Sequence, residues 1–158
     1  PDLIVALPST TKTTKALFKT EAVFDFATQY YYKHPHIDSI IDFSLKPSDF
    51  QDFVTYVKTD ETFISPVQNS IETSKKMALK ADLNVEKIYQ KLIDEISIEQ
   101  FSHFQKDKND INEALSSEII RRYYFEKGMY QYNLSRDNTL KNAINLLNNN
   151  TKYQAILH

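Results

Sequence analysis

The sequence predicts an all-α protein, a compact bundle of five to seven helices preceded by a short extended segment. Gly128 is the only glycine in 158 residues, whereas sheet-rich folds spend glycine on hairpin turns and bulges. Apolar residues recur at helical spacing in several separate windows. Hydrophobic residues make up 41% of the chain, which is enough to fill a core. Together these observations favour helices that pack into one folded domain.

Composition also excludes several classes of function. The formal charge is −2, so we expect no nucleic-acid partner, because such proteins are usually basic. There is no cysteine, which excludes disulfides, cysteine-bound zinc and thiol catalysis. No apolar run approaches the ~18 residues that a membrane-spanning helix needs, so we expect no membrane insertion. A single glycine also argues against a glycine-rich phosphate-binding loop.

The first elements are an extended segment and one helix. Residues 1–8 are bounded by prolines and are expected to be extended. The first helix is predicted from a stripe at i, i+3, i+4, i+7 and i+8, which consists of Val23, Phe26, Ala27, Tyr30 and Tyr31. It should end at His34, because the residue before Pro35 avoids the α region. Residues 36–46 are expected to form an ordered loop.

Two helices are predicted in the middle of the chain. Ser48 and Gln51 match a capping box, and Phe50, Phe53, Val54 and Val57 then form one buried face. Residues 59–62 should break this helix. Pro66 suits the first helical position after Ser65, and the following helix is weakly amphipathic to about Asp82.

The second half of the chain carries the clearest helical stripes. Asn84 is expected to cap a helix whose stripe is Val85, Ile88, Tyr89, Leu92 and Ile96. Residues 106–110 are polar and predicted to be a connection. The longest helix is predicted from Ile111 to about Tyr132. Leu140, Ala143, Ile144 and Leu147 form a further stripe, and Thr151 with Gln154 matches a second capping box.

The residues that could act in catalysis or bind a metal do not combine into a predicted catalytic, cofactor or metal site. His34 and His36 form an H-x-H pair without a third ligand, and His103 stands alone in a helical stripe. Ser9 and Lys12 match the S-x-x-K spacing of serine–lysine catalysis. Nothing near Lys12 would lower its pKa, and no glycine-containing turn offers an oxyanion hole. We therefore assign no catalytic residue, metal ligand or cofactor.

The segment from Arg121 to Phe125 mixes cations with aromatic rings, as single-strand binders do. Here the rings continue the apolar stripe of the helix, so core aromatics beside snorkelling or ion-paired arginines are the favoured interpretation. Glu118 is placed one turn before Arg122 and is expected to pair with it. Gly128 either ends the helix or allows a close approach of another helix, and close packing is slightly favoured.

Residues 117–157 resemble the closing segment of bacterial carboxyl-terminal processing (tail-specific) serine peptidases. The matching residues are Arg122, Tyr123, Tyr124, Phe125, Gly128, Asp137, Ala143, Leu147 and the stretch from Tyr153 to Leu157. Near the start, Pro1-Asp2 and the segment from Val23 to Ala27, with Tyr30 and His34-Pro35, also resemble that family. The middle, roughly residues 60–110, matches only by position and helical character.

The resemblance implies a function for the whole family and a narrower one for this chain. Members have a serine–lysine dyad in a glycine-containing core and a PDZ domain, and neither has a counterpart here. We therefore expect residues 1–15 to be a linker or the end of an upstream peptidase core, and residues 16–158 to be a non-catalytic helical C-terminal domain. The implied partners are the rest of the peptidase chain, a second copy, or an adaptor or substrate protein. By family analogy the location is the bacterial periplasm.

A stand-alone helical module that binds a partner helix in an aromatic groove is the alternative. Ten tyrosines and ten phenylalanines supply anchors for such a surface. An exposed aromatic patch would favour this alternative, and rings wholly buried in the core would count against it.

Overall fold

The computed structural model describes residues 9–37, 39–59, 63 and 65–157, and within these ranges it contains helices and no strands. The all-α prediction is therefore confirmed. The helices of the described ranges are α1 (Lys12–Leu17), α2 (Ala22–Lys33), α3 (Pro47–Thr59), α4 (Pro66–Lys80), α5 (Glu86–Lys106), α6 (Lys108–Arg136), α7 (Asn138–Asn148) and α8 (Asn150–Leu157).

The extended segment predicted at residues 1–8 lies outside the described residues. Helix α1 begins at Lys12, before the domain boundary that we placed after residue 15. That boundary stays a prediction.

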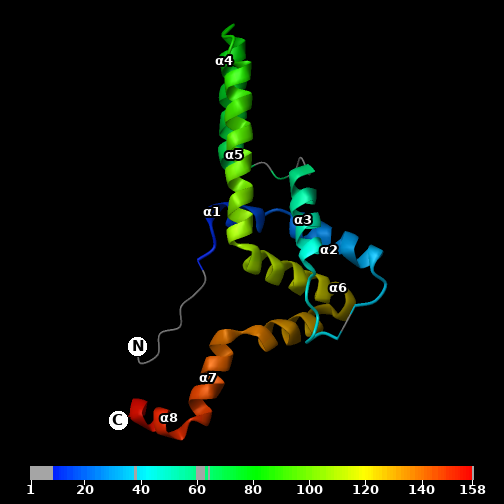
Figure 1. Ribbon diagram of the computed structural model, residues 1–158, viewed down its shortest axis with the longest axis vertical. Helices are drawn as coiled ribbons and strands as arrows, with labels where there is room; N and C mark the ends of the chain where they lie inside the picture. Colours follow the sequence, from blue (N-terminus) through cyan, green and yellow to red (C-terminus); the bar gives the residue numbers. More distant parts are fainter. Residues whose placement is uncertain (1–8, 38, 60–62, 64, 158) are drawn as a thin grey trace.

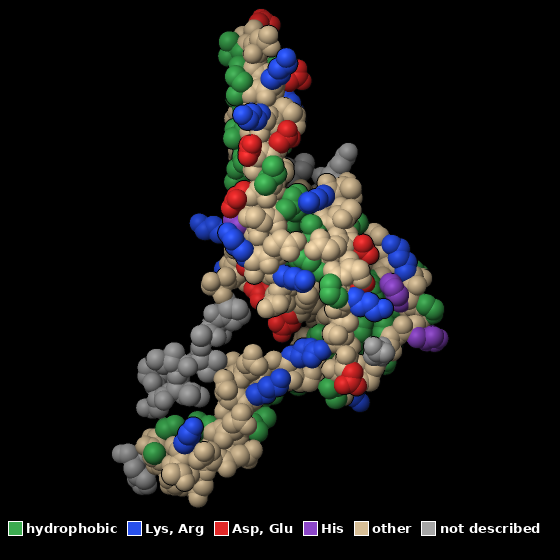
Figure 2. All heavy atoms as spheres, viewed as in Figure 1, with side chains coloured by type: hydrophobic (Ala, Val, Ile, Leu, Met, Phe, Trp, Pro, Cys, Tyr) green, Lys and Arg blue, Asp and Glu red, His purple; other side chains and the backbone are tan. Residues whose placement is uncertain are grey.

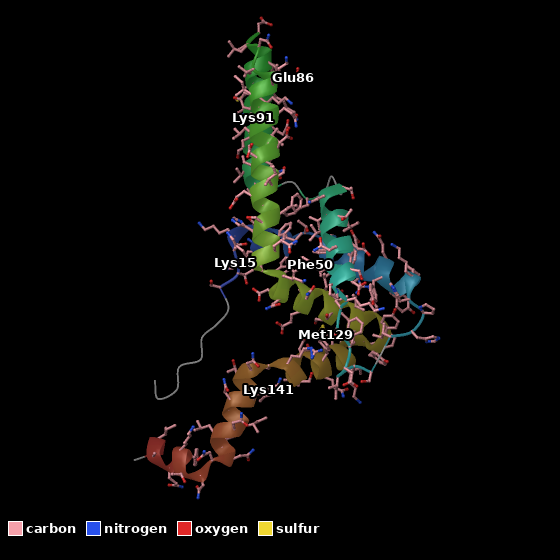
Figure 3. The ribbon with its side chains drawn as sticks, viewed as in Figure 1. Lys15, Phe50, Glu86, Lys91, Met129 and Lys141 are labelled. Atoms are coloured by element: carbon pink, nitrogen blue, oxygen red, sulfur yellow. The ribbon has the colours of Figure 1, made fainter. Side chains whose placement is uncertain are left out.

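A compact body is formed by α1, α2, α3, the second half of α5 and the first half of α6 (Figure 1). Helix α2 makes its main contacts with α6. The predicted face of α3 is confirmed, because its four apolar residues are all buried. The largest fully buried side chains of the body include Phe50, Phe53 and Phe104. Figure 3 shows Phe50 in this body.

A second, smaller core lies beside the first. It consists of Ala27 from α2, Phe43 from the loop before α3, and Ile119, Ile120 and Tyr132 from α6. The loop that we expected to be ordered is therefore held by Phe43, which is 3% exposed. Arg136 reinforces this attachment, since its Nη2 donates to the carbonyl of Phe43 at 2.6 Å.

Helices α4 and α5 pack side by side and project from the body as a two-helix arm (Figure 1). We call residues 66–100 the arm. Ser65 and Gln68 form a complete capping box at the start of α4, with Pro66 in the first turn, as the sequence predicts for Pro66. Gln68 also donates to the Ser97 hydroxyl at 2.9 Å. No residue of α4 is fully buried.

Helices α7 and α8 extend from the opposite end of the body (Figure 1). They pack against each other, and none of the residues of α7 is fully buried. The stripe predicted for this region is present on α7, but its side chains are exposed, with Leu140 at 37%, Ile144 at 46% and Leu147 at 63%.

Three predicted helix caps are wrong. Ser48 lies inside α3, where Asp49 instead accepts from the backbone N–H of Lys46 at 2.8 Å. The N-cap of α5 is Val85 without a side-chain bond, so Asn84 does not cap it. For α8 it is the Asn149 side chain that accepts from Lys152 N–H at 3.1 Å, rather than Thr151. These predictions are wrong because Ser, Thr, Asn and Asp can all cap a helix, so the residue type alone does not determine where the helix begins.

The polar connection predicted at residues 106–110 is a single residue, Asp107, because α5 ends at Lys106 and α6 begins at Lys108. Figure 1 shows the sharp change of direction at this corner. The predicted end of α2 at His34 is confirmed, since α2 ends at Lys33 with His34 as its C-cap.

Candidate functional site

Five of the residues that carry the family resemblance lie around a kink in α6. Phe125 has φ 57° and ψ −165°, a region occupied almost only by glycine and strained for other residues. The helix therefore changes direction after Tyr124. We call Arg122, Tyr123, Tyr124, Phe125 and Gly128 the kink cluster.

The kink explains why residue 128 is glycine. It is buried, and a Cβ atom added there would lie closer than 3.0 Å to the Cβ of Tyr124 and 3.5 Å from Ile40 Cδ1. The sequence favoured a close approach of another helix at Gly128, and this is wrong, because the closest neighbour is Tyr124 in the preceding turn of the same kinked helix. The helix itself continues past Gly128 to Arg136.

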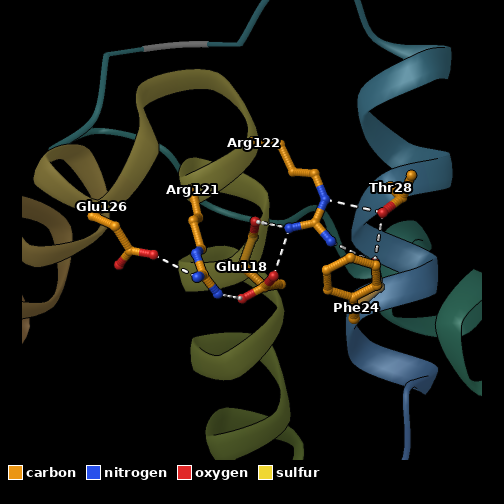
Figure 4. A network of polar contacts seen from close by, with 6 residues as sticks. All are labelled: Phe24, Thr28, Glu118, Arg121, Arg122 and Glu126. Atoms are coloured by element: carbon orange, nitrogen blue, oxygen red, sulfur yellow. Dashed lines mark hydrogen bonds and ion pairs between the residues drawn. The ribbon is translucent and has the colours of Figure 1, made fainter.

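Arg122 fastens α6 to α2 (Figure 4). Its Nε donates to Thr28 Oγ1 at 3.0 Å and its Nη2 donates to the carbonyl of Phe24 at 3.0 Å. Its guanidinium also lies over the Phe24 ring, 4.1 Å from the centroid. The predicted pair with Glu118 is present at 2.5 Å. Such a planar, multiply bonded guanidinium fixes geometry in a way that lysine cannot.

Arg121 spans the kink on the more exposed side. Its Nη2 lies 2.5 Å from Glu126 and its Nη1 lies 3.6 Å from Glu118 (Figure 4). Hydrogen bonding to Glu126 raises the pKa of Arg121 above its usual range. The two arginines therefore differ in role, because Arg122 holds two helices together and Arg121 joins the two halves of one helix.

Tyr123 covers the side of the kink that faces the end of α2. The Tyr123 hydroxyl donates to the carbonyl of His34, and its ring packs edge-on against Tyr31 at 4.8 Å. Burial raises the pKa of Tyr123, and the nearby Tyr31 adds to this effect. The sequence predicts that the aromatic rings from Arg121 to Phe125 belong to the core and that the arginines snorkel or form ion pairs. The intramolecular contacts of Arg122 and Tyr123 fit this prediction.

Phe125 does not fit the core interpretation. Its side chain is 77% exposed, although its backbone holds a strained conformation. Tyr153, the remaining site residue from the resemblance, is half-buried in α8. Tyr153 is not part of the kink cluster. The structure therefore joins five of the six predicted residues and separates the sixth.

A second polar cluster ties the start of the domain to the α5–α6 corner. Thr11 caps α1 and donates to Asp107 Oδ2 from its N–H at 2.8 Å and from its hydroxyl at 2.6 Å. Thr10 donates to Asp110 at 2.8 Å. Burial alone would raise the pKa of Asp107, but hydrogen bonds from Thr11 and Thr14 hold the pKa below its usual value.

This attachment was missed from the sequence. From the sequence, Ser9 and Lys12 suggest only an S-x-x-K motif, and Asp107 belongs to a predicted polar connection. In the structure Ser9 precedes α1 and is exposed, as is Lys12. No local pattern could have joined residue 11 to residue 107.

His34 and His103 make ordinary structural contacts. The ring of His34 stacks on Tyr30 at 4.0 Å, and its Nδ1 lies 2.9 Å from the Tyr30 carbonyl. His103 contacts Thr13 at 2.8 Å and Glu99 at 3.4 Å. Among the described residues, no group of three metal-ligating side chains converges. A search of the same residues finds no helix with the length and apolar character required to cross a bilayer.

Comparison with known proteins identifies the family of this domain. The family model described as "Probable PDZ-protease, C-terminal helical domain" matches residues 13–147. The chain belongs to this family. No curated protein matches it, and no solved structure does.

The match confirms the resemblance and places this domain at the C-terminal, helical part of a probable PDZ-protease. It covers all of the kink cluster, whereas Tyr153 lies beyond its end. A helical C-terminal domain of a protease is consistent with a non-catalytic part of that protein, as the sequence predicts.

Proposed function

We propose that this domain is a non-catalytic contact domain that braces the peptidase part of its own chain through the outer side of the kink cluster. The family description supports this choice of partner, because a C-terminal domain of a PDZ-protease follows the rest of that protease in the chain. The parent would be a tail-specific serine endopeptidase whose catalytic serine and lysine lie upstream.

The observation that carries the proposal is Phe125. Its backbone strain costs about 1–3 kcal/mol, yet its ring is 77% exposed and returns little packing energy to the domain. Strain of this kind persists where the surrounding structure imposes it, and it is concentrated at functional sites. An exposed aromatic ring held at a rigid kink is a suitable anchor for a protein contact.

Hydrogen exchange tests the proposal. Amides of residues 118–132 should exchange more slowly in the longer parent protein than in the 158-residue chain, because the peptidase part would cover the kink. Phe125→Ala in the parent should abolish that extra protection. Tyr32→Ala is the matched control, since Tyr32 is 79% exposed on a regular helix. Equal protection of residues 118–132 in both proteins would refute the contact.

The stand-alone interaction module remains the alternative. Seven aromatic rings are at least 38% exposed among the described residues, namely Phe18, Phe24, Tyr31, Tyr32, Tyr124, Phe125 and Tyr130. An immunoblot of fractionated source cells separates the two functions. We expect a band much larger than 18.5 kDa in the bacterial envelope fraction, as the periplasmic proposal requires. A band of that small size in the cytoplasm would favour the module.

A further inference from the structure

We propose that the arm pairs with the arm of a second copy of this chain, antiparallel and related by a two-fold axis. This inference rests on the proposal that the domain makes protein contacts, but it uses a different surface. The contact at Phe125 and the pairing of the arms can therefore fail separately.

Charge along the arm is divided by sign. Its outer half, residues 75–91, has five lysines, Lys75, Lys76, Lys80, Lys87 and Lys91, against two carboxylates, Asp82 and Glu86. Its inner half, residues 66–74 and 92–100, has four carboxylates, Glu72, Asp94, Glu95 and Glu99, and no lysine or arginine. An arm with a basic outer half and an acidic inner half is complementary to a copy of itself only when the two run in opposite directions.

The charges on α5 also lie at matching positions. Lys87, Lys91, Glu95 and Glu99 follow one another at four-residue intervals and so lie along one side of the helix. If two copies of α5 cross antiparallel at Ile93, Lys87 of one copy lies opposite Glu99 of the other. In the same register Lys91 lies opposite Glu95. The two-fold axis repeats each pair, which gives four ion pairs across the interface.

These four side chains are exposed. Within the described residues the sole ion pair that any of them makes is Glu99 with His103, at 3.4 Å. Figure 3 shows Lys91 on the projecting part of the arm, with Glu86 nearer its outer end. Lys87, Lys91 and Glu95 are therefore free to bind a partner in the way that the register requires, and Glu99 would bind its partner beside His103.

The arm also presents apolar side chains that an interface would cover. Ile88 is 69% exposed and Leu92 is 44% exposed, and they lie one turn apart beside the charged column. In the antiparallel register Ile88 lies opposite Ile98, which is 67% exposed. Figure 2 shows hydrophobic side chains along one edge of the arm. Charge matching at the rim and apolar contact inside are the usual anatomy of an interface.

The length of the arm suits the pairing. From Glu86 to Gln100, where the side chain becomes buried against the body, α5 rises by about 21 Å. With the axis at Ile93, the outer end of each arm reaches the inner end of the other and stops where the body begins. Two paired arms then form a four-helix bundle, which is how amphipathic helix hairpins bury their faces.

The test is the mass of the 158-residue chain in solution, by sedimentation equilibrium at concentrations up to about 1 mM. We expect a dimer that weakens as salt rises to about 0.5 M. Lys87→Glu with Lys91→Glu should weaken the dimer at least tenfold, and so should Glu95→Lys with Glu99→Lys. An equimolar mixture of the two variants should restore it as a heterodimer, and the chain with all four changes should restore it as a homodimer.

Lys141→Glu with Lys152→Glu, in α7 and α8, is the matched control for Lys87→Glu with Lys91→Glu, since both pairs change the net charge by the same amount. Far-UV circular dichroism checks the fold of each variant. The four-change chain repeats the intrahelical charge pattern with signs inverted, so it guards against loss of helix stability. A monomer at every concentration overturns the proposal. So does a dimer that neither reversal weakens, or a mixture that does not restore association.

Discussion

Gly128→Ala tests the account of the kink most directly. The added Cβ would lie closer than 3.0 Å to the Cβ of Tyr124, an atom one bond from the backbone that no rotamer change can move away. Overpacking of this kind costs about 1–3 kcal/mol, and a clash with such a fixed atom belongs at the upper end. Alanine regains up to about 1 kcal/mol of helix propensity. The net loss should be about 2 kcal/mol.

Chemical denaturation followed by circular dichroism measures this loss, and the melting temperature should fall by about 4–8 °C for a domain of this size. Tyr124→Gly removes the Cβ that is contacted, so Gly128→Ala should cost far less in that background. Asn145→Ala, at an exposed position of α7, serves as the control and should change stability little. A neutral or stabilising Gly128→Ala would refute the close approach at the kink.

Three further substitutions probe the other contacts. Arg122→Ala should lower the free energy of unfolding by about 1.5–3 kcal/mol, the usual worth of a charged hydrogen bond, whereas Arg121→Ala should leave the melting temperature unchanged because its ion pairs are solvent-exposed. Phe125→Gly should raise stability by about 1 kcal/mol by relieving strain, and a loss would show that the ring packs within the domain. The pKa of Asp107 is lowered in the folded state, so the ionised carboxylate stabilises the fold fully above the pKa of the unfolded chain, about 3.9. This contribution is lost as the pH falls through the pKa of the folded state. The stability advantage over Asp107→Asn, measured by urea unfolding, should therefore shrink between about pH 5 and about pH 2, and an advantage that stays constant would refute it.

Helices with regular apolar spacing were predicted well. The buried face of α3 and the end of α2 at His34 both depend on local rules, apolar periodicity in the first case and the restriction before Pro35 in the second. The structure contains both. Such features could be predicted because residues a few positions apart determine them.

Features that depend on distant residues could not be predicted in the same way. Asp107 looks like part of a solvated turn, and only the fold brings Thr11 to it. The kink at Phe125 is also hidden, because phenylalanine is not a residue that favours a positive φ. The stripe on α7 shows a further limit, since periodicity indicates an apolar face but not whether anything in the domain covers it.

The resemblance identified five residues that the structure brings together around the kink, although periodicity alone assigned them to an uninterrupted helix. The sequence could not show that each of these residues has a different structural role. Arg122 bridges two helices, Gly128 leaves room for the preceding turn, and Phe125 faces outward. The roles of Gly128 and Phe125 depend on the strained backbone at Phe125, and that of Arg122 depends on the packing of α6 against α2. Neither feature can be read from composition or spacing.

The attachment of Thr11 to Asp107 has a mechanical consequence. Asp107 is the single residue between the long helices α5 and α6, and Thr11, directly before α1, is attached to it through two short hydrogen bonds. A force applied to the chain before Thr11 would therefore be transmitted directly to Asp107, at the base of α5. The N-terminal segment and the helix that forms the arm are attached to the body at the same residue.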